Sequence, residues 1–526
     1  MRTGLSKSLI EKVLGGAPKH TIAELEAMNP QNNTGETTRV APSPTGYMHI
    51  GGIYQALINW KIAKQTGGKF YLRIDDTDQK REIPGAVEII VNSLDALGLA
   101  PDGVTTQSQR GDIYRATAAD LLEKGLAYPC FMTQEDMDKV RAQQKMLGLQ
   151  TGIYGEWARD RDITPEEIEA KLAAGEKPTI RLYSSGDPSK KIYCKDAVRG
   201  SMAFTENNDD IVLIKSTDGL PTYHFAHLVD DHFLRTTLVV RADEYLSTFP
   251  LHIQMFATMG WQAPKYIHTS TLDKIDEESG KQRKLSKRKD PEANVAYFLD
   301  EGWPAEAIKN YLFNIANSGF EEALSKNPAA NIENYEFKIK KIPTSGALFD
   351  RDKLEWWAKE FIATLPLGEL VRRVSDWIEK HGSDYHKNEI LGDMDYLKAV
   401  LAIERDDPKR IRKDFVYWEQ VVCSDIAFFF PMEIGFFRRS ARQFINEEVN
   451  SEFLAAYNPS DTKEEWWAKI QAIAAKSGLK NGEVAMALRV MLAGREQTPD
   501  LYSMIKVMGE DRVRKRLKQK WEPVVF

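Results

Sequence analysis

The chain has 526 residues, of which 42% are hydrophobic and 28% charged, and its formal net charge is -6. This composition is ordinary for a globular protein, and the length allows roughly three or four domains. The mild acidity argues against a protein that binds DNA in bulk, and the three widely spaced cysteines, Cys130, Cys194 and Cys423, exclude a disulfide framework and a local zinc knuckle.

The first 37 residues are predicted to be an N-terminal extension. They contain two short helical stretches, around residues 5–14 and 22–28, followed by a polar segment. This region lacks the apolar core of a signal peptide, and no apolar run in the chain approaches a membrane span. We therefore expect a cytoplasmic protein without a membrane partner, while the role of the extension stays open.

From residue 38 the pattern predicts alternating strands and helices. Residues 38–41 form a short strand, the loop 42–52 follows, and a helix with one apolar face comes next. A strand at 69–74 and a helix at about 84–97 continue the alternation. Such an order predicts an α/β fold with a doubly wound, Rossmann-like parallel sheet, in which ligands bind at the carboxyl ends of the strands.

The loop at residues 42–52 lies at such a ligand-binding position. Its prolines stiffen the chain, and Gly51 and Gly52 allow backbone N–H groups to approach a ligand at the helix N-terminus. His49 directly precedes that helix and is placed to bond a phosphate or ribose oxygen. A lone histidine is more often a core residue, but the surrounding glycines and prolines favour the binding interpretation here.

The remaining chain is predicted to contain three further parts. Residues 111–208 interrupt the alternation as an inserted α+β module, and the strand at 211–214 resumes the sheet within a second half of the sheet domain, residues 209–345. Residues 346–526 form an all-helical C-terminal region, since almost every segment there has helical periodicity. Its basic end, from residue 511, either contacts RNA or faces solvent.

A run of basic residues occurs between residues 281 and 289. It contains six cations, namely Lys281, Arg283, Lys284, Lys287, Arg288 and Lys289. By charge alone such a run is usually a solvated loop or a nonspecific nucleic-acid patch. Paired with the glycine-rich loop at 42–52, it instead predicts a mobile loop that wraps a polyphosphate.

Two of these segments resemble the paired signatures of the class I aminoacyl-tRNA synthetases. The first is Ala41-Pro-Ser-Pro-Thr-Gly with His49-Ile-Gly-Gly52, and the second is Lys284-Leu-Ser-Lys-Arg288. Further segments are similar to the bacterial glutamyl-tRNA synthetase family, namely Leu72-Arg-Ile-Asp-Asp-Thr-Asp78, Gln107-Ser-Gln-Arg110, Gly219-Leu-Pro-Thr-Tyr-His224, Val229-Asp-Asp231, Arg241-Ala-Asp-Glu-Tyr245 and Met486-Ala-Leu-Arg489. The resemblance covers most of the chain after residue 38 and is weakest between about 350 and 480.

This resemblance implies a glutamate–tRNA ligase with glutamate, ATP and tRNA(Glu) as partners, acting as a monomer. It divides the catalytic domain into residues 38–110 and 209–345, the second of which includes a stem-contact region. It makes residues 111–208 an acceptor-end-binding module and assigns anticodon binding to residues 346–526. The family places glutamate against Arg39, Ala41, Ser43, Asp75, Tyr223 and Arg241. It places ATP, which brings Mg²⁺, against Gly51, Gly52, Glu244, Tyr245 and Lys287, with His49, Lys284, Lys287 and Arg288 as catalytic residues.

Local chemistry supports several of these roles. An arginine offers a planar bidentate donor to a carboxylate, and Arg39 and Arg241 each lie at the end of a predicted strand. Taken singly, an arginine is more often a surface ion-pair partner. One of the aspartates at 75, 76 and 78 is also expected to cap a helix.

The sequence departs from the family pattern at three places. Asp75 stands where glutamate is more common, Tyr245 where tryptophan is common, and Cys130 is followed by Phe131-Met132 without a second cysteine. The first change affects the expected contact to the substrate ammonium group. The last predicts that no zinc is bound.

Other functions remain open from the sequence. Glutaminyl-tRNA synthetases share the catalytic fold but usually end in β-barrels, and an enzyme that glutamylates queuosine in tRNA would lack the C-terminal region. A catalytically inactive RNA-binding paralogue and a general nucleotidyltransferase are further alternatives. The sequence does not determine whether tRNA(Gln) is also charged, which residues read the anticodon, or the oligomeric state.

Overall fold

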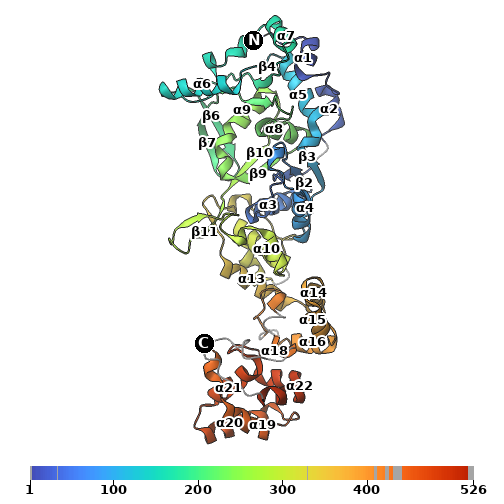
Figure 1. Ribbon diagram of the computed structural model, residues 1–526, viewed down its shortest axis with the longest axis vertical. Coiled ribbons are helices and arrows are strands. Elements are labelled where there is room, and N and C mark those ends of the chain that lie inside the picture. Colours follow the sequence, from blue (N-terminus) through green and yellow to red (C-terminus); the bar gives the residue numbers. More distant parts are fainter. Residues whose placement is uncertain are drawn as a thin grey trace. The chain divides into compact units, whose positions relative to one another are not determined.

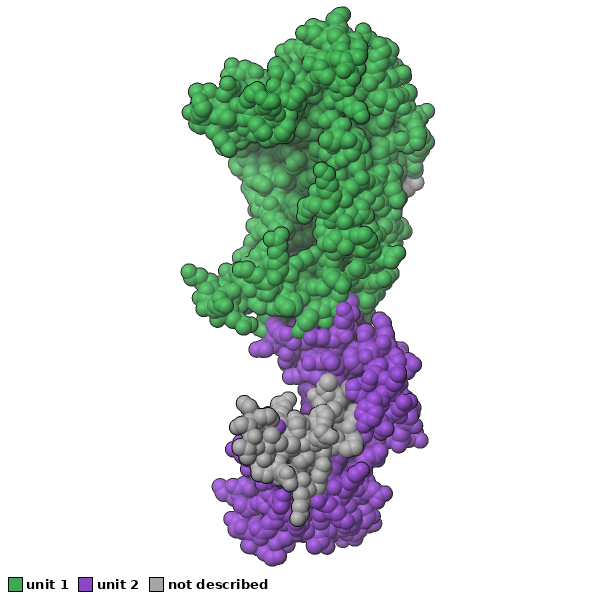
Figure 2. All heavy atoms as spheres, in the orientation of Figure 1, with its two compact units in different colours: residues 1–297, 309–350 green, residues 298–308, 351–526 purple. Residues whose placement is uncertain are grey.

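The computed structural model describes residues 3–31, 34–327, 330–407, 411–420, 426–429 and 441–518. The chain folds into two compact units, coloured separately in Figure 2: residues 1–297 with 309–350, and residues 298–308 with 351–526. None of the helices in the described residues combines the length and the apolar character that a membrane crossing requires.

Figure 1 labels the helices and strands where there is room. The described α-helices of the first unit are α1 (Lys7–Leu14), α2 (Ile22–Met28), α3 (Ile50–Thr66), α4 (Ala86–Ala96), α5 (Gly111–Glu123), α6 (Gln134–Met146), α7 (Pro165–Ala173), α8 (Tyr223–Phe233), α9 (Phe249–Thr258) and α12 (Phe320–Lys326). Helices α10 (Val295–Asp300) and α11 (Ala305–Ala316) contribute to both units. Those of the second unit are α13 (Arg351–Thr364), α14 (Leu367–His381), α15 (Asp384–His386), α16 (Met394–Ala402), α18 (Ile426–Phe429), α19 (Glu447–Ala456), α20 (Lys463–Ser477), α21 (Asn481–Ala493) and α22 (Leu501–Leu517).

The described strands form two parallel sets and two smaller sheets. The parallel sets contain β1 (Thr37–Val40), β2 (Lys69–Ile74) and β3 (Gly103–Thr106), then β6 (Lys191–Asp196), β9 (Leu238–Ala242) and β10 (Lys265–Thr269), with β7 (Gly200–Thr205) antiparallel at the edge. The smaller sheets contain β4 (Ala127–Cys130), β5 (Thr179–Leu182) and β8 (Val212–Ile214), and β11 (Leu272–Ile275), β12 (Gln282–Lys284) and β13 (Ala347–Leu348).

The two parallel sets meet between β1 and β9. The Thr237 N–H donates to the Thr37 carbonyl over 2.9 Å, which places the residue before β9 beside the first residue of β1. The resulting order is β3-β2-β1 followed by β9-β10-β6-β7. The chain moves outward from the centre through β1, β2 and β3 on one side and from β9 to β10 on the other, so the predicted doubly wound parallel sheet is confirmed.

One predicted strand belongs to a different sheet. The prediction that residues 211–214 resume the parallel sheet is wrong, because β8 pairs antiparallel with β5. Conversely, β6 lies within the predicted module at 111–208 but pairs in parallel with β10. Periodicity indicates which residues form a strand, whereas the partner of that strand depends on the whole fold. The predicted domain boundaries stay predictions.

A pair of glycines lets α3 turn directly into β2. Gly67 ends the helix with φ of 72°, a left-handed conformation that costs a glycine little. At Gly68 a Cβ atom would lie 2.0 Å from the Glu36 carbonyl oxygen. The close approach of the two chains therefore needs glycine at this position, and it holds the entry to β1 beside the entry to β2.

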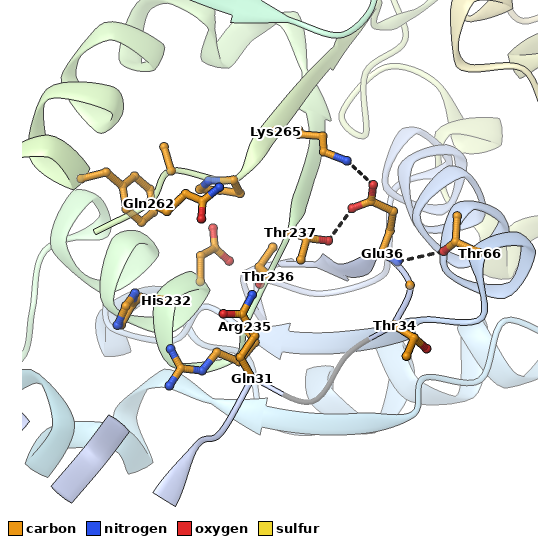
Figure 3. A pocket seen from close by; sticks show the side chains of 15 residues that line it. Gln31, Thr34, Glu36, Thr66, His232, Arg235, Thr236, Thr237, Gln262 and Lys265 are labelled. Carbon is orange, nitrogen blue, oxygen red and sulfur yellow. Dashed lines mark hydrogen bonds and ion pairs between the residues drawn. The ribbon is translucent and has the colours of Figure 1, made fainter. Parts of the chain in front are cut away.

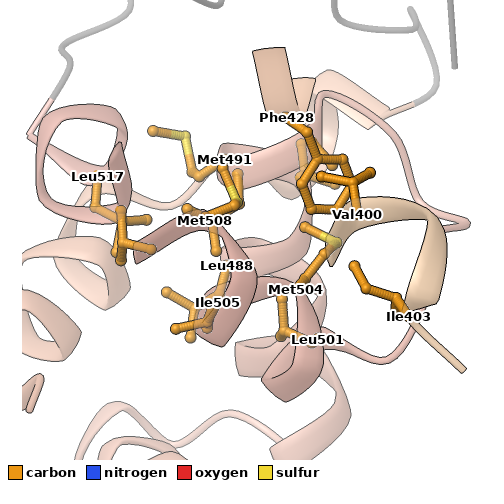
Figure 4. Close-up of a cluster of buried hydrophobic side chains, with 14 of the residues drawn as sticks. Val400, Ile403, Phe428, Leu488, Met491, Leu501, Met504, Ile505, Met508 and Leu517 are labelled. Atoms are coloured by element: carbon orange, nitrogen blue, oxygen red, sulfur yellow. The ribbon is translucent and has the colours of Figure 1, made fainter. Parts of the chain in front are cut away.

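The second unit is built around one apolar cluster contributed mainly by α14, α16 and α19–α22. Figure 4 shows part of it, where Leu488, Met491, Met504, Ile505 and Met508 lie among one another. Among the described residues of 346–526 the only strand is β13. The prediction of a helical C-terminal region is confirmed.

Replacing Leu488 by alanine should destabilise the second unit by about 2–5 kcal/mol, since a fully buried leucine leaves a cavity when truncated. The measurements are the free energy of urea unfolding and the rate of hydrogen exchange in peptides from α20–α22. Gln471→Ala on the exposed face of α20 is the control and should change stability by less than about 0.5 kcal/mol. Equal effects of the two variants would contradict the assigned core.

Candidate active site

A cavity of about 490 Å³ opens at the carboxyl ends of β1 and β9. It is bounded by the loop at residues 41–52 and by the basic run. Nine of the predicted site residues line it: Ala41, Ser43, His49, Gly51, Gly52, Glu244, Tyr245, Lys284 and Lys287. Segments separated by more than two hundred residues thus meet at the edge of the sheet where this fold binds ligands.

His49 connects the two predicted signatures. Its Nδ1 accepts the Gly51 N–H over 2.9 Å and so caps α3. Because Nδ1 accepts, the ring proton is on Nε2, which donates to the Leu285 carbonyl at 3.3 Å. Burial and the nearby Lys287 ammonium lower the pKa of His49, which favours the neutral ring. A phosphate contact from Nε2 would require His49 to release Leu285.

The predicted catalytic cations differ in their positions. Lys287 donates to the Tyr47 carbonyl in the glycine-rich loop, and Lys284 pairs with Glu244, one of the predicted ATP contacts. Both ammonium groups therefore bridge the walls of the cavity. Arg288 is exposed and does not line the cavity.

Arg283 fixes the base of this loop. Its guanidinium donates to both carboxylate oxygens of Asp290 over 2.7 and 2.8 Å, and to Asp276 over 2.6 Å. The same Asp290 accepts the Ser286 N–H over 2.8 Å. The hydrogen bonds from Arg283 hold the pKa of Asp290 far below its usual range. Arg283 is therefore a structural member of the basic run, and it closes the turn that carries Lys284 and Lys287.

The other predicted residues, Arg39, Asp75, Tyr223 and Arg241, lie beside the cavity and not on its lining. Tyr245 joins the two regions, since its ring centroid lies 6.0 Å from that of Tyr223 and 5.7 Å from the guanidinium carbon of Arg241. Arg39 and Arg241 are only 4% and 5% exposed. That burial excludes the alternative of surface ion-pair partners.

Buried ion pairs hold Arg39 and Asp75 in place. Arg39 Nε donates to Asp231 Oδ1 over 2.8 Å, and Arg73 Nη1 reaches the same oxygen over 3.2 Å. Arg73 also donates to both oxygens of Asp75, over 2.7 and 3.0 Å. Burial raises the pKa of Asp75, and the Arg73 charge opposes that rise. A substrate ammonium group would therefore share the Asp75 carboxylate with Arg73.

The expectation that one of the three aspartates caps a helix is wrong. Asp78 precedes a short 3₁₀ turn without a side-chain capping bond. Asp76 instead accepts the Ser108 N–H and hydroxyl over 2.8 and 2.5 Å, which ties the end of β2 to the segment after β3. The local turn pattern did not reveal this partner, because Ser108 lies 32 residues away.

Sequence reasoning did not assign roles to several buried polar residues around the arginines. Asp230 and Asp231 on α8, together with His227, His252 and His268, are all at most 1% exposed. The sequence of strand β10 did contain a signal for these residues. Tyr266 and His268 are two positions apart and therefore lie on one face of the strand, which predicts a polar group beside the sheet. Only the fold shows that this group contacts Arg241.

A second cavity, of about 460 Å³, opens at the opposite ends of the parallel strands. Figure 3 shows Lys265, Thr237 and Thr66 converging on Glu36. None of the predicted site residues lines it. Since ligands of a doubly wound sheet bind at the carboxyl ends of the strands, this cavity is a less suitable active site.

The N-terminal extension packs on the same side of the first unit. Leu9, Ile10 and Leu25 belong to an apolar cluster with α5 and α8. Glu26 accepts from Arg235 and His232 over 2.5 and 2.6 Å, which joins the extension to the turn between α8 and β9. The extension thus supports the helix that carries the buried aspartates.

Two cysteines are described, and both are buried thiols. Burial raises the pKa of Cys130, and it raises the pKa of Cys194 to about 11. Cys423 lies outside the described residues. Among the residues that the structure describes, no three His, Cys, Asp or Glu side chains gather as metal ligands.

Comparison with known proteins identifies the family. Residues 37–356 match the model "tRNA synthetases class I (E and Q), catalytic domain", and residues 424–520 match "Anticodon binding domain". The glutamate–tRNA ligase of Clostridium perfringens (strain SM101 / Type A) is 40% identical over 516 residues, covering 91% of this chain and 93% of that protein. The ligase of Acetivibrio thermocellus is 38% identical over 521 residues, covering 92% and 93%.

A solved structure agrees. The glutamate tRNA ligase from Elizabethkingia meningosepticum CCUG26117, crystallised in complex with its amino acid, superposes with a TM-score of 0.74 at 26% identity, covering 92% of this chain and 98% of that one. Sequence and fold lead to the same assignment. The chain belongs to the bacterial glutamate–tRNA ligase family of class I aminoacyl-tRNA synthetases.

Proposed function

We propose that this chain activates L-glutamate with ATP and transfers the glutamyl group to the terminal ribose of tRNA(Glu). The observation that carries the proposal is the meeting of the two signature segments at one cavity, where Lys284 and Lys287 face the glycine-rich loop. The volume of about 490 Å³ falls in the range of small-molecule sites. Backbone N–H groups at the start of α3 add the donors that a phosphate requires.

In the first step a glutamate carboxylate oxygen attacks the α-phosphorus of ATP in line. The new oxygen–phosphorus bond gives glutamyl-adenylate as the bond to pyrophosphate breaks. Negative charge builds on the phosphate oxygens, and Lys284 and Lys287 stabilise it, with Arg288 approaching from the exposed side of the loop. Mg²⁺ arrives with ATP, bound to its phosphate oxygens. The protein positions the two substrates and neutralises the charge on the phosphate oxygens, and no protein nucleophile is needed.

Glutamate is proposed to bind beside this cavity. Arg39 and Arg241 hold its two carboxylates, Asp75 receives the ammonium group, and Tyr223 and Ser43 line the pocket. Glu244 and Tyr245 contact the adenosine, because both line the cavity and Tyr245 also lies beside Tyr223 and Arg241. This arrangement brings the attacking carboxylate toward the α-phosphate.

In the second step the terminal ribose hydroxyl of tRNA attacks the glutamyl carbonyl, and AMP leaves. Residues 111–208 would hold the acceptor end and residues 346–526 the anticodon, which the anticodon-binding match at 424–520 supports. We propose that the enzyme acts as a monomer in the cytoplasm, where its tRNA substrate is found.

The test is ATP–pyrophosphate exchange with glutamate or glutamine, each with and without tRNA(Glu) or tRNA(Gln). We expect exchange that depends on glutamate and requires tRNA. Exchange supported by glutamine alone would overturn the assignment in favour of a glutaminyl-tRNA synthetase. No exchange under any condition would indicate an inactive tRNA-binding relative. Charging of tRNA(Gln) with glutamate would extend the substrate range without changing the reaction.

A further inference from the structure

Arg241 differs from the neighbouring buried arginines in having no carboxylate partner. Arg39 pairs with Asp231, and Arg73 pairs with Asp75. In the described part of the chain no carboxylate oxygen lies within 4.0 Å of an Arg241 nitrogen. The charges of the first two arginines are compensated by direct contact, and that of Arg241 is not.

Two imidazoles take the place of carboxylates around Arg241. Arg241 Nε donates to His268 Nε2 over 2.9 Å, and Nη1 lies 3.1 Å from His252 Nδ1. A guanidinium has only donors, so both ring nitrogens accept, and each ring carries its proton on the other nitrogen. Neutral imidazoles of this kind accept from Nε and Nη1 of the guanidinium without cancelling its charge.

Each imidazole is held in the accepting tautomer by a second partner. His268 Nδ1 lies 2.8 Å from Asp196 Oδ2, which also accepts the His268 backbone N–H over 2.9 Å. His252 Nε2 lies 3.0 Å from His224 Nδ1. Burial lowers the pKa of His252 and of His268, and the Arg241 charge lowers both further.

Asp196 is itself fixed at the end of β6. Its other oxygen accepts the N–H groups of Val198 and Arg199, each over 2.8 Å. Burial alone would raise the pKa of Asp196, but the hydrogen bonds from His268 and the backbone outweigh it and lower that pKa. The Asp196 carboxylate therefore orients His268 by direct contact. The imidazole ring of His268 separates this carboxylate from Arg241.

The third nitrogen of the guanidinium is left for another acceptor. Arg241 Nη2 is buried and has no hydrogen-bond partner among the described residues. A buried donor without a partner is destabilising, so an acceptor supplied by a ligand would be favoured here. The nearby ring of Tyr245 lines the cavity, which places this nitrogen close to the proposed glutamate site.

We propose that His252 and His268 are positioning residues that hold Arg241 as an uncancelled positive charge for a carboxylate of glutamate. The inference rests on the proposed function, and it explains how the positive charge of Arg241 is kept from being neutralised. A carboxylate at either histidine position would hold the arginine equally well but would neutralise it. The effect of charge can thus be separated from the effect of structure.

The test compares His252→Gln with His252→Glu, two variants that match in shape and in acceptor but differ in charge. Exchange is measured at about pH 8, where glutamate side chains are ordinarily ionised, with tRNA(Glu) present. We expect the KM for glutamate to change by less than about threefold in His252→Gln and to rise about tenfold or more in His252→Glu. The KM for ATP should stay within about twofold in both, because ATP is held by other residues.

Equal KM values for glutamate in the two variants, or parallel increases for glutamate and ATP, would overturn the inference. A second pair, His268→Gln and His268→Leu, decides the matter if His252→Glu does not fold, as judged by circular dichroism melting. His268→Gln keeps the acceptor and should retain the KM for glutamate, whereas His268→Leu should raise it. Wild-type protein without glutamate-dependent exchange would instead refute the proposed function itself.

Discussion

Replacing Lys287 by alanine should slow glutamate-dependent ATP–pyrophosphate exchange about 10²-fold, a loss of roughly 3 kcal/mol of transition-state stabilisation. The ammonium group lines the cavity and bonds the Tyr47 carbonyl, so it faces the position proposed for the phosphates. Its charge matters most when pyrophosphate leaves. The loss should therefore fall on kcat more than on the KM for glutamate.

The matched control for this experiment is Lys289→Ala. Lys289 lies in the same run, is exposed and does not line the cavity. The Lys289→Ala substitution removes one positive charge from the loop, as Lys287→Ala does. Its rate of ATP–pyrophosphate exchange should stay within about threefold of wild type. Near-normal exchange by Lys287→Ala would remove that lysine from the mechanism. Equal losses in both variants would point to a general effect of charge and not to a contact in the site.

Replacing Asp231 by alanine should destabilise the first unit by about 3–5 kcal/mol, because it leaves buried positive charge without its partner. Asp231 is 1% exposed and receives hydrogen bonds from both Arg39 and Arg73. Arg73 would retain Asp75, whereas Arg39 would lose its carboxylate. The expected result is a lower urea midpoint and faster hydrogen exchange in peptides from β1 and α8.

Asp120→Ala serves as the control for that variant. Asp120 pairs with Lys124 on the surface of α5, and such an exposed pair contributes less than about 1 kcal/mol. Because both variants remove one aspartate from the same unit, they differ mainly in burial. A small effect of Asp231→Ala, similar to that of Asp120→Ala, would show that the buried network does not hold Arg39.

The Arg283–Asp290 pair illustrates what charge counting misses. In the sequence Arg283 is one of six similar cations, and by charge alone the whole run is usually a solvated loop or a nonspecific nucleic-acid patch. In the fold it donates three hydrogen bonds to two carboxylates and closes the turn that carries Lys287. Asp290 follows the run directly, so a local pair was visible in principle, but the bidentate geometry was not.

The sequence by itself determined the order of strands and helices, the parallel sheet and the two segments that meet at the cavity. These features depend on local signals: the apolar periodicity around residues 53–63, the paired glycines at 67–68 and the glycine-proline loop before α3. Such signals act within one turn or one strand. They hold wherever the segment is placed, which is why they can be read without the fold.

Only the tertiary structure decided which strands pair and which polar groups meet. The pairing of β8 with β5, and of β6 with β10, follows from packing of the whole unit. Arg39 meets Asp231 across 192 residues, and Arg241 takes its imidazole partners from α9 and β10. A buried charge accepts any partner that satisfies it, so its residue type predicts that a partner exists, and the fold selects which one.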